Sequence, residues 1–157
     1  MLTGGWKFAR IIHLTLGRDV RFMAKGVKIV LFVRKLLREN KISADVFAET
    51  AKKYPTKDAL VCAETGEKLT YKDADELINK IANIFQEAGY QKGDVVGLLM
   101  ENCIEYFPIW LGLSKIGVII SLLNFNLRGD GLKHCIKVAD CKALIYSPTL
   151  EKALSDI

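Results

Sequence analysis

The sequence has no glycine-rich motif for binding phosphate. Neither G-x-G-x-x-G nor G-x-x-x-x-G-K-[ST] occurs in its 157 residues, although such loops are the usual means of surrounding phosphate oxygens with backbone amides. Ser114 and Ser121 also lack the G-x-S-x-G context in which a sharp turn exposes a nucleophilic serine. We therefore assign no catalytic and no cofactor-binding residue, and a small flavodoxin-like nucleotide binder is a weak interpretation of this chain.

Residues that ligate metals are few and scattered. The chain has two histidines, His13 and His134, and neither has a neighbour at a spacing that suggests acid-base catalysis. Its four cysteines form no C-x-x-C pair and have no histidine at ligand spacing, so we assign no metal ligand. Free cysteines are usually small buried hydrophobes in a reducing compartment, and we expect that here. The four are Cys62, Cys103, Cys135 and Cys141.

No stretch of the sequence is long and apolar enough to cross a bilayer. A transmembrane helix needs about 20 mostly apolar residues, and the runs IIHLTL and VKIVLFV are much shorter. The start MLTGGWKFAR has neither the uninterrupted apolar core nor the cleavage site of a secretory signal peptide. We expect no membrane span in these residues.

The composition is that of a globular α/β protein, with 50% hydrophobic and 26% charged residues. A chain of this length can bury about 70% of its unfolded surface. The net charge of +5 is unevenly distributed: residues 1–42 hold ten Lys or Arg against two acidic residues, a balance of +8, and residues 43–157 hold 13 against 16, a balance of −3. We therefore predict a basic amphipathic helical segment over 1–42 and an α/β region over 43–157.

The basic segment intersperses cations with apolar and aromatic side chains, and Gly17 is expected to divide it into two helices. Such helices are typical of a membrane interface, where each cation near an anionic leaflet contributes about 1 kcal/mol. Docking of both helices on the protein itself, with the cations in water, stays open as an alternative. Nucleic acid is a poorer third choice, because no recognised binding motif accompanies the charge. The candidate membrane-surface residues are Trp6, Lys7, Arg10, Arg18, Arg21, Lys25, Lys28, Arg34 and Lys35.

The pattern of residues 70–126 predicts helix, strand, helix and strand in succession. Thr70 and Asp73 form a capping-box-like pair, and apolar residues then follow helical spacing towards Gly89, which suits a left-handed cap. The runs VVGLLM and VIISLL are too short for helices, and we interpret them as strands buried on both faces, with a helix over 104–116 between them. Two such strands predict a right-handed βαβ crossover and a parallel sheet.

Shorter elements are expected on both sides of this stretch. Ser43 is expected to cap a helix over 45–54, and ALVCA and KLTY to form a β-hairpin. A helix over 131–139 and the strand KALIYS come later, and Pro148 begins a last helix. Together these elements predict an α/β fold with an incomplete, doubly wound, mostly parallel sheet and flanking helices. We expect the fold to be incomplete because the last helix has barely begun where the sequence ends.

Polar residues follow the two central strands at their carboxyl ends, the edge at which open α/β sheets bind ligands. Glu101 and Asn102 follow the first strand, and Asn124, Asn126 and Arg128 follow the second. We predict that Asn102, Asn124, Asn126 and Arg128 line a site. A local role is the alternative, since Asn102 suits a helix N-cap and the pair Asn124 and Asn126 suits a turn.

Several motifs resemble the adenylate-forming superfamily. LTYKDADEL, KGDVVGLL and LSKIG are similar to the pattern TY-x-E-L, GD-x-V-A and L-K-x-G of its N-terminal subdomain. Other motifs resemble the branch of fatty acid transport proteins and very-long-chain acyl-CoA synthetases. They are MEN before WLGLSKIGV, then NFNLR and LKHC, and the opening GGW with a later RD. The resemblance covers residues 4–157.

The resemblance implies a ligase that activates a fatty carboxylate with ATP, so that the CoA thiol displaces AMP from an acyl-adenylate while Mg²⁺ neutralises the phosphates. It also implies association with the cytosolic face of the endoplasmic reticulum or plasma membrane, with residues 1–42 as a juxtamembrane segment. The family's phosphate loop, its adenine and ribose contacts and its catalytic lysine have no counterpart here. No catalytic residue is therefore carried over.

The hypothesis from the sequence is an N-terminal fragment of a membrane-associated long-chain or very-long-chain fatty acid–CoA ligase, inactive by itself. ATP, Mg²⁺ and CoA would serve the parent enzyme, and no motif in these residues would bind them. The alternative is a non-catalytic membrane-surface or interaction module of α/β fold. The sequence does not specify the acyl chain length or the oligomeric state.

Overall fold

The computed structural model describes the backbone of residues 4–155 and the side chains from residue 20 onward. Contacts within the chain divide it into two compact units, residues 1–41 and 42–157.

The first unit is one continuous helix, α1 (Gly4–Arg38), of 35 residues. The prediction that Gly17 divides this segment into two helices is wrong, because a helical glycine costs only about 1 kcal/mol relative to alanine and good helix formers flank it. The helix ends where Asn40 adopts a left-handed conformation with a φ of 50°. The Lys41 N–H then donates to the Leu36 carbonyl at 3.0 Å, which is the geometry of a Schellman motif.

The second unit begins with helix α2 (Ser43–Lys53). Ser43 is the first residue of this helix rather than its cap, so the prediction of a Ser43 N-cap is wrong. The Ile42 N–H instead donates to Asp45 Oδ2 at 2.9 Å. The carboxylate in the first turn thereby satisfies an amide that has no partner within the helix.

The predicted β-hairpin is confirmed. β1 (Asp58–Val61) pairs antiparallel with β2 (Lys68–Thr70). The Cys62 N–H donates to the Glu67 carbonyl at 2.9 Å beyond the last strand pair. Gly66 has a φ of 74°, a left-handed conformation that glycine adopts without steric cost in a tight turn.

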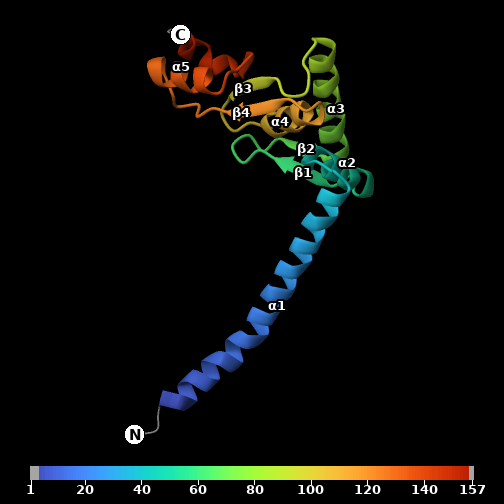
Figure 1. Ribbon diagram of the computed structural model, residues 1–157, viewed down its shortest axis with the longest axis vertical. Coiled ribbons are helices and arrows are strands. Elements are labelled where there is room, and N and C mark those ends of the chain that lie inside the picture. Colours follow the sequence, from blue (N-terminus) through green and yellow to red (C-terminus); the bar gives the residue numbers. More distant parts are fainter. Residues whose placement is uncertain (1–3, 156–157) are drawn as a thin grey trace. The chain divides into compact units, whose positions relative to one another are not determined.

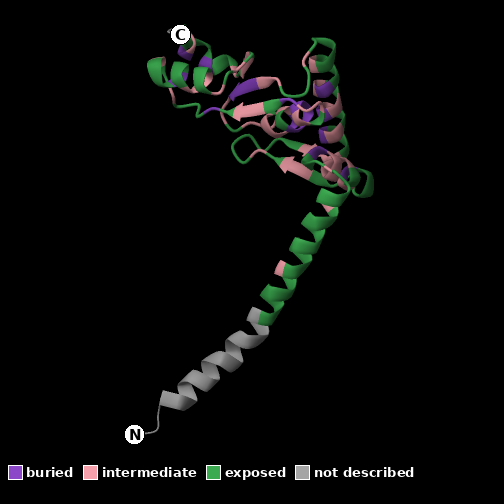
Figure 2. Cartoon of the chain, in the orientation of Figure 1, coloured by how far each residue is buried: buried purple, intermediate pink, exposed green. Residues whose placement is uncertain are grey.

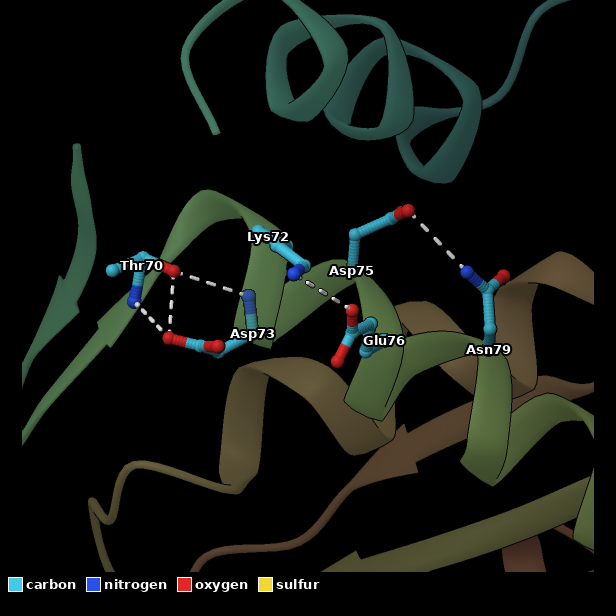
Figure 3. Close-up of polar contacts among 6 residues, drawn as sticks. All are labelled: Thr70, Lys72, Asp73, Asp75, Glu76 and Asn79. Atoms are coloured by element: carbon cyan, nitrogen blue, oxygen red, sulfur yellow. Dashed lines mark hydrogen bonds and ion pairs between the residues drawn. The ribbon is translucent and has the colours of Figure 1, made fainter. Parts of the chain in front are cut away.

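Helix α3 (Tyr71–Glu87) begins and ends at the signals that the sequence contains. Thr70 Oγ1 accepts from the Asp73 N–H at 3.2 Å, and the Thr70 N–H donates to Asp73 Oδ2 at 3.3 Å (Figure 3). This is a reciprocal capping box. At the other end Gly89 has a φ of 85°. The Tyr90 N–H donates to the carbonyl five residues earlier at 3.0 Å, which completes a Schellman motif.

Three parallel strands form the main sheet, in the order β4-β3-β5. Figure 1 labels two of them, β3 and β4. They are β3 (Val95–Leu99), β4 (Ile119–Leu122) and β5 (Ala143–Tyr146). The chain runs from the central strand β3 to one neighbour and then crosses to the other. This is the order of a doubly wound sheet, and the predicted fold class is confirmed.

A helix follows each of these strands. α4 (Tyr106–Lys115) and α5 (Gly129–Val138) each begin two residues from the predicted start. The predicted helix at Pro148 is a 3-10 helix, η1 (Pro148–Ala153). α4 and α5 also end at left-handed residues, Gly117 with a φ of 78° and Asp140 with a φ of 54°.

Different helices cover the two faces of β3. Val96 packs in a buried cluster with Leu113 of α4, whereas Leu99 packs in another cluster with Leu132 of α5 and Leu150 of η1. Neighbouring side chains of a strand point to opposite faces, so residues 96 and 99 lie on different faces of the sheet. The second unit therefore has helices on both faces of its parallel sheet.

Strand β4 is at an edge of the sheet, and the prediction that VIISLL is buried on both faces is wrong. Ile119 is 56% exposed and Leu122 is 51% exposed, whereas residues 96–99 of β3 are buried (Figure 2). Both strands are equally apolar in sequence. Burial is decided by the position of a strand among its neighbours, which composition does not encode.

The glycine inside α4 permits close packing against α3. A Cβ placed on Gly112 would lie 2.9 Å from the Ile78 carbonyl oxygen and 2.9 Å from the Ile81 Cβ. Contacts this short are not tolerated between carbon and a backbone atom that is held in a helix. The absence of a side chain at this position sets the separation of the two helices.

We expect Gly112→Ala to destabilise the protein by about 1–3 kcal/mol through overpacking, even though alanine favours a helix by about 1 kcal/mol. Gly131→Ala in α5 is the matched control, because its Cβ would meet nothing closer than Leu127 Cδ2 at 3.8 Å. The control should be neutral or more stable than the wild type. Urea unfolding of both variants measures the difference, and equal stability of Gly112→Ala and wild type would contradict the packing explanation.

Candidate functional site

The carboxyl ends of the three parallel strands form the candidate site. In a doubly wound sheet, ligands bind where the connections from two adjacent strands leave in opposite directions. Here that point lies between β3 and β5, because β3 connects to β4 on one side and the chain then returns to pair β5 on the other.

A hydrogen-bonded carboxylate occupies this point. Glu101 follows β3 and accepts hydrogen bonds from two hydroxyl groups that follow β5, from Ser147 Oγ to its Oε2 and from Thr149 Oγ1 to its Oε1, the latter at 2.7 Å. The Ser147 N–H also donates to the Leu99 carbonyl at 3.2 Å, which continues the ladder between β3 and β5. These bonds join the ends of the two strands across the switch point.

The same bonds set the protonation behaviour of Glu101. Hydrogen bonds from the Ser147 and Thr149 side chains, with a smaller attraction from Arg128, hold the pKa of this carboxyl below its ordinary value of 4.5, against a partial opposing effect of desolvation. Hydrogen bonds to a carboxylate favour its charged form. Glu101 is therefore an ionised acceptor at neutral pH rather than a general acid.

The four residues predicted to line a site fall in three different surroundings. Asn102 lies against the hairpin, in the wall of a cavity of about 320 Å³ that residues of β1 and α4 also line. It is not the N-cap of α4, whose N-cap is Glu105, so the proposed local role of Asn102 is wrong. Asn124 Oδ1 accepts from the Asn126 N–H at 2.9 Å, which is the turn contact that the local alternative describes for this pair.

Arg128 bonds mainly to its own loop. Its Nη1 donates to the Phe125 carbonyl at 2.6 Å and to the Leu127 carbonyl at 2.7 Å. Its charge nonetheless acts on Glu101, so it is the member of the predicted set that contributes to the switch point. Ser147 and Thr149 were not among the predicted residues. The signal was available, because Ser147 is the last residue of KALIYS and Thr149 lies two positions further on, at the same edge of the sheet.

The carboxylate at the switch point connects the ends of β3 and β5. Both oxygens of the Glu101 carboxylate are already engaged by hydroxyl groups. Within the part of the chain that the structure describes, no group of three or more acidic, histidine or cysteine side chains could hold a metal ion.

The described part of α1 carries a narrow cationic stripe. At 3.6 residues per turn, Arg21, Lys25, Lys28 and Lys35 lie within an arc of about 80°, and all four are exposed. Arg34 is exposed outside this arc, and the side chains of Trp6, Lys7, Arg10 and Arg18 lie outside the described residues. Exposed apolar side chains occupy most of the remaining circumference: Val20, Phe22, Met23, Val27, Ile29, Val30, Leu31, Val33 and Leu37. One exposed apolar side chain, Phe32, lies within the cationic arc itself.

Among the helices that the structure describes, none combines the length and the apolar character needed to cross a bilayer.

Comparison with protein families gives one match that covers most of the second unit. A family model described as AMP-binding enzyme matches residues 47–156.

The curated relatives include fatty acid transport proteins. The chain is 36% identical to the Mus musculus long-chain fatty acid transport protein 1, over 98% of this chain and 24% of that protein. It is 30% identical to the Homo sapiens long-chain fatty acid transport protein 6, over 88% of this chain and 23% of that protein. A Cochliobolus heterostrophus very long-chain fatty acid transport protein is 32% identical over 71% of this chain. The chain thus spans 24% of the length of the first of these relatives.

Solved structures of similar fold include two isolated N-terminal domains and one fatty acyl CoA synthetase. The N-terminal domain of FACL13 from Mycobacterium tuberculosis has a TM-score of 0.68 and 25% identity, over 71% of this chain and 28% of that one. The N-terminal subdomain of Klebsiella oxytoca NpsA has a TM-score of 0.65 and 27% identity, over 69% and 28%. A Mycobacterium tuberculosis fatty acyl CoA synthetase has a TM-score of 0.67 and 25% identity, over 71% and 22%.

Acid is expected to weaken the folded state partly through Glu101. Because its folded pKa lies below 4.5, the carboxylate stabilises the fold above that value, and this contribution is lost as the pH falls through the lower folded pKa. Glu101→Gln should therefore be less stable than the wild type at neutral pH, and the difference should diminish in acid. Urea midpoints measured across this pH range test the expectation.

The control for this experiment is Glu76→Gln on the exposed surface of α3. The Glu76 carboxylate only approaches Lys72 Nζ at 3.8 Å (Figure 3), and exposed pairs of this kind contribute little to stability. A Glu101→Gln difference that matches the control, or that does not change with pH, would contradict the role given to Glu101.

Proposed function

Because the chain belongs to the AMP-binding enzyme family, we propose that it forms the N-terminal part of the adenylate-forming domain of a long-chain or very-long-chain fatty acid–CoA ligase. Such a ligase activates the fatty acid with ATP as an acyl-adenylate and transfers the acyl group to CoA. The observation that supports this most is the similarity to fatty acid transport proteins along 98% of the chain. The structural likeness to a fatty acyl CoA synthetase supports the same reaction class.

The residues of this chain act as scaffold in that function. ATP and Mg²⁺ need a phosphate-binding loop and oxygen ligands, and the 157 residues include no such loop motif. The described side chains likewise form no cluster that could hold a metal ion. We therefore route no step of the ligase reaction through these residues, and assign ATP, Mg²⁺ and CoA to the complete enzyme. This chain supplies a sheet, its covering helices and the bonded switch point at Glu101.

The second part of the proposal concerns the membrane surface. The stripe of Arg21, Lys25, Lys28 and Lys35 is suited to anionic headgroups, and the wide apolar surface of α1 is suited to the boundary between headgroups and acyl chains. We place the complete ligase at the cytosolic face of the endoplasmic reticulum or plasma membrane, where its fatty acid substrate partitions.

A non-catalytic membrane-surface or interaction module is the second candidate function. The observation that favours it is the same exposed surface of α1, which does not require a ligase. Measurements of acyl-CoA formation by a chimera discriminate between the two candidates. A segment that comes from a ligase can replace the matching segment of another ligase, whereas an unrelated module cannot.

We expect the isolated 157-residue chain to form no acyl-CoA from fatty acid, ATP, Mg²⁺ and CoA above a no-protein control. A chimera in which it replaces the matching segment of the mouse long-chain fatty acid transport protein 1 should regain acyl-CoA formation. The control chimera carries Gly112→Ala, which should lower the amount of folded chimera without changing the reaction catalysed. A folded but inactive first chimera would count against the ligase, and activity of the isolated chain would overturn the scaffold role.

Neutralising the cationic stripe should weaken binding to anionic vesicles. Replacing Arg21, Lys25, Lys28 and Lys35 with Gln removes four charges, each contributing about 1 kcal/mol near an anionic surface, so affinity should fall by about 10²- to 10³-fold. Co-sedimentation with phosphatidylcholine vesicles, with and without phosphatidylserine, measures this effect.

The matched control for vesicle binding removes the same charge from the second unit, through Gln at the exposed residues Lys52, Lys80, Lys133 and Lys137. It should bind nearly as the wild type does. Equal losses in the two variants would show that net charge rather than the α1 stripe governs binding. Vesicle binding that changes neither with the phosphatidylserine content nor with the salt concentration would exclude an electrostatic contribution.

A further inference from the structure

The cavity that Asn102 lines lies between the β-hairpin and the loop that follows β3. Its volume is about 320 Å³. The end of β1 and the following turn form one wall, and the residues between β3 and α4 form the other. The apolar side chains in these walls are Leu60, Val61, Ile104 and Phe107.

Two thiol groups from different elements line this one cavity. Cys62 follows β1, and Cys103 lies in the loop before α4. Both are free and partly exposed. The hairpin holds Cys62 in place, because its N–H donates to the Glu67 carbonyl at 2.9 Å and its carbonyl accepts from the Gly66 N–H at 2.9 Å. A nucleophile is therefore fixed at the wall of an apolar space.

The surroundings of the two thiols differ in their effect on reactivity. Hydrogen bonds from the Thr65 side chain, then from the backbone of Thr65 and Glu64, lower the pKa of the Cys62 thiol. Burial raises the pKa of the Cys103 thiol. Since the thiolate is the nucleophile, these surroundings favour Cys62 over Cys103 as the reacting thiol.

The remaining cysteines of the chain are placed differently. Cys135 packs against the buried cluster that contains Leu99 and Leu132. Burial raises the pKa of the Cys141 thiol. Neither residue lines the cavity beside the hairpin.

We propose that Cys62 is a site of S-acylation by a long-chain acyl thioester, with the start of the acyl chain held by the apolar walls of this cavity. A reagent that combines an electrophilic carbonyl with an apolar tail matches a site that combines a nucleophile with an apolar space. Long-chain acyl-CoA has both features and is the product of the proposed ligase, so the biological source of the reagent rests on the proposed function.

The reaction is a thioester exchange that needs no oxidant and no ATP. The Cys62 sulfur attacks the acyl carbonyl, and the new bond between Sγ and the carbonyl carbon replaces the bond between that carbon and the CoA sulfur. CoA leaves as the thiolate and takes up the proton that Cys62 released. The acyl group remains on the protein as a thioester.

The test uses the purified chain under reducing conditions, with palmitoyl-CoA added and ATP omitted. We expect a mass increase of one palmitoyl group, mapped to Cys62 and removed by hydroxylamine. Cys62→Ser should lower the initial labelling rate at least tenfold, whereas the matched variant Cys103→Ser should label like the wild type. Acetyl-CoA should label Cys62 several-fold more slowly than palmitoyl-CoA, because it has no chain to place in the cavity.

A further variant distinguishes the contribution of the cavity walls from the reactivity of the Cys62 thiol. Val61 is 56% exposed, so Val61→Ser should fold normally while making one wall polar. Its labelling by palmitoyl-CoA should fall several-fold, and its alkylation at Cys62 by iodoacetamide should be unchanged. Parallel losses with both reagents would overturn the acyl-binding role of the cavity.

Other outcomes overturn the proposal as a whole. Palmitoyl labelling that persists in Cys62→Ser would place the reaction elsewhere. Wild-type chain that reacts with iodoacetamide at Cys62 but not with palmitoyl-CoA would show a reactive thiol with no acyl site. Because acyl-CoA is supplied and ATP is absent, these results do not depend on the chimera assay for ligase activity, and either proposal can fail alone.

Discussion

Burial of residues 96–99 in the central strand β3 is the constraint on which the second unit depends. β3 pairs with β4 on one side and β5 on the other, and Val96, Leu98 and Leu99 have no exposed surface. Backbone amides removed from water must be paired, and apolar side chains on both faces need cover. α4 and α5 therefore pack on opposite faces of the sheet, and the missing side chain at Gly112 allows α4 to approach α3 closely enough to complete one layer.

The polar edge of the sheet follows from the same arrangement. Parallel strands end at a common edge, so the loops after β3 and β5 meet even though Glu101 and Ser147 are 46 positions apart. Their hydrogen bonds join two strands that no turn connects, at the point where an open α/β sheet has its crevice. Both oxygens of the carboxylate are already bonded there, which agrees with the scaffold role proposed for these residues.

Most of the second unit could be predicted because its signals are local. Thr70, Asp73 and Gly89 determine where α3 begins and ends, since a cap needs only residues within one turn of the helix. The strands of the sheet were found as short apolar runs, and their parallel pairing followed from the helices between them. Two of the errors are also local: Ser43 was given a capping role that the Asp45 side chain performs, and in the first unit Gly17 was given a helix-breaking effect larger than its propensity supports.

The sequence by itself determined most helices and strands, their order, the family and the uneven charge of the chain. Each of these is encoded by residues that are neighbours in the sequence or by short motifs. Only the tertiary structure decided that β4 is an edge strand, that Ser147 and Thr149 hold Glu101, that Asn102 lies beside the hairpin, and that Cys62 and Cys103 share one cavity. The physical reason is that these properties belong to contacts between residues far apart in the chain. Such contacts depend on which elements pack together, and an apolar run has the same composition whether a neighbour covers it or not.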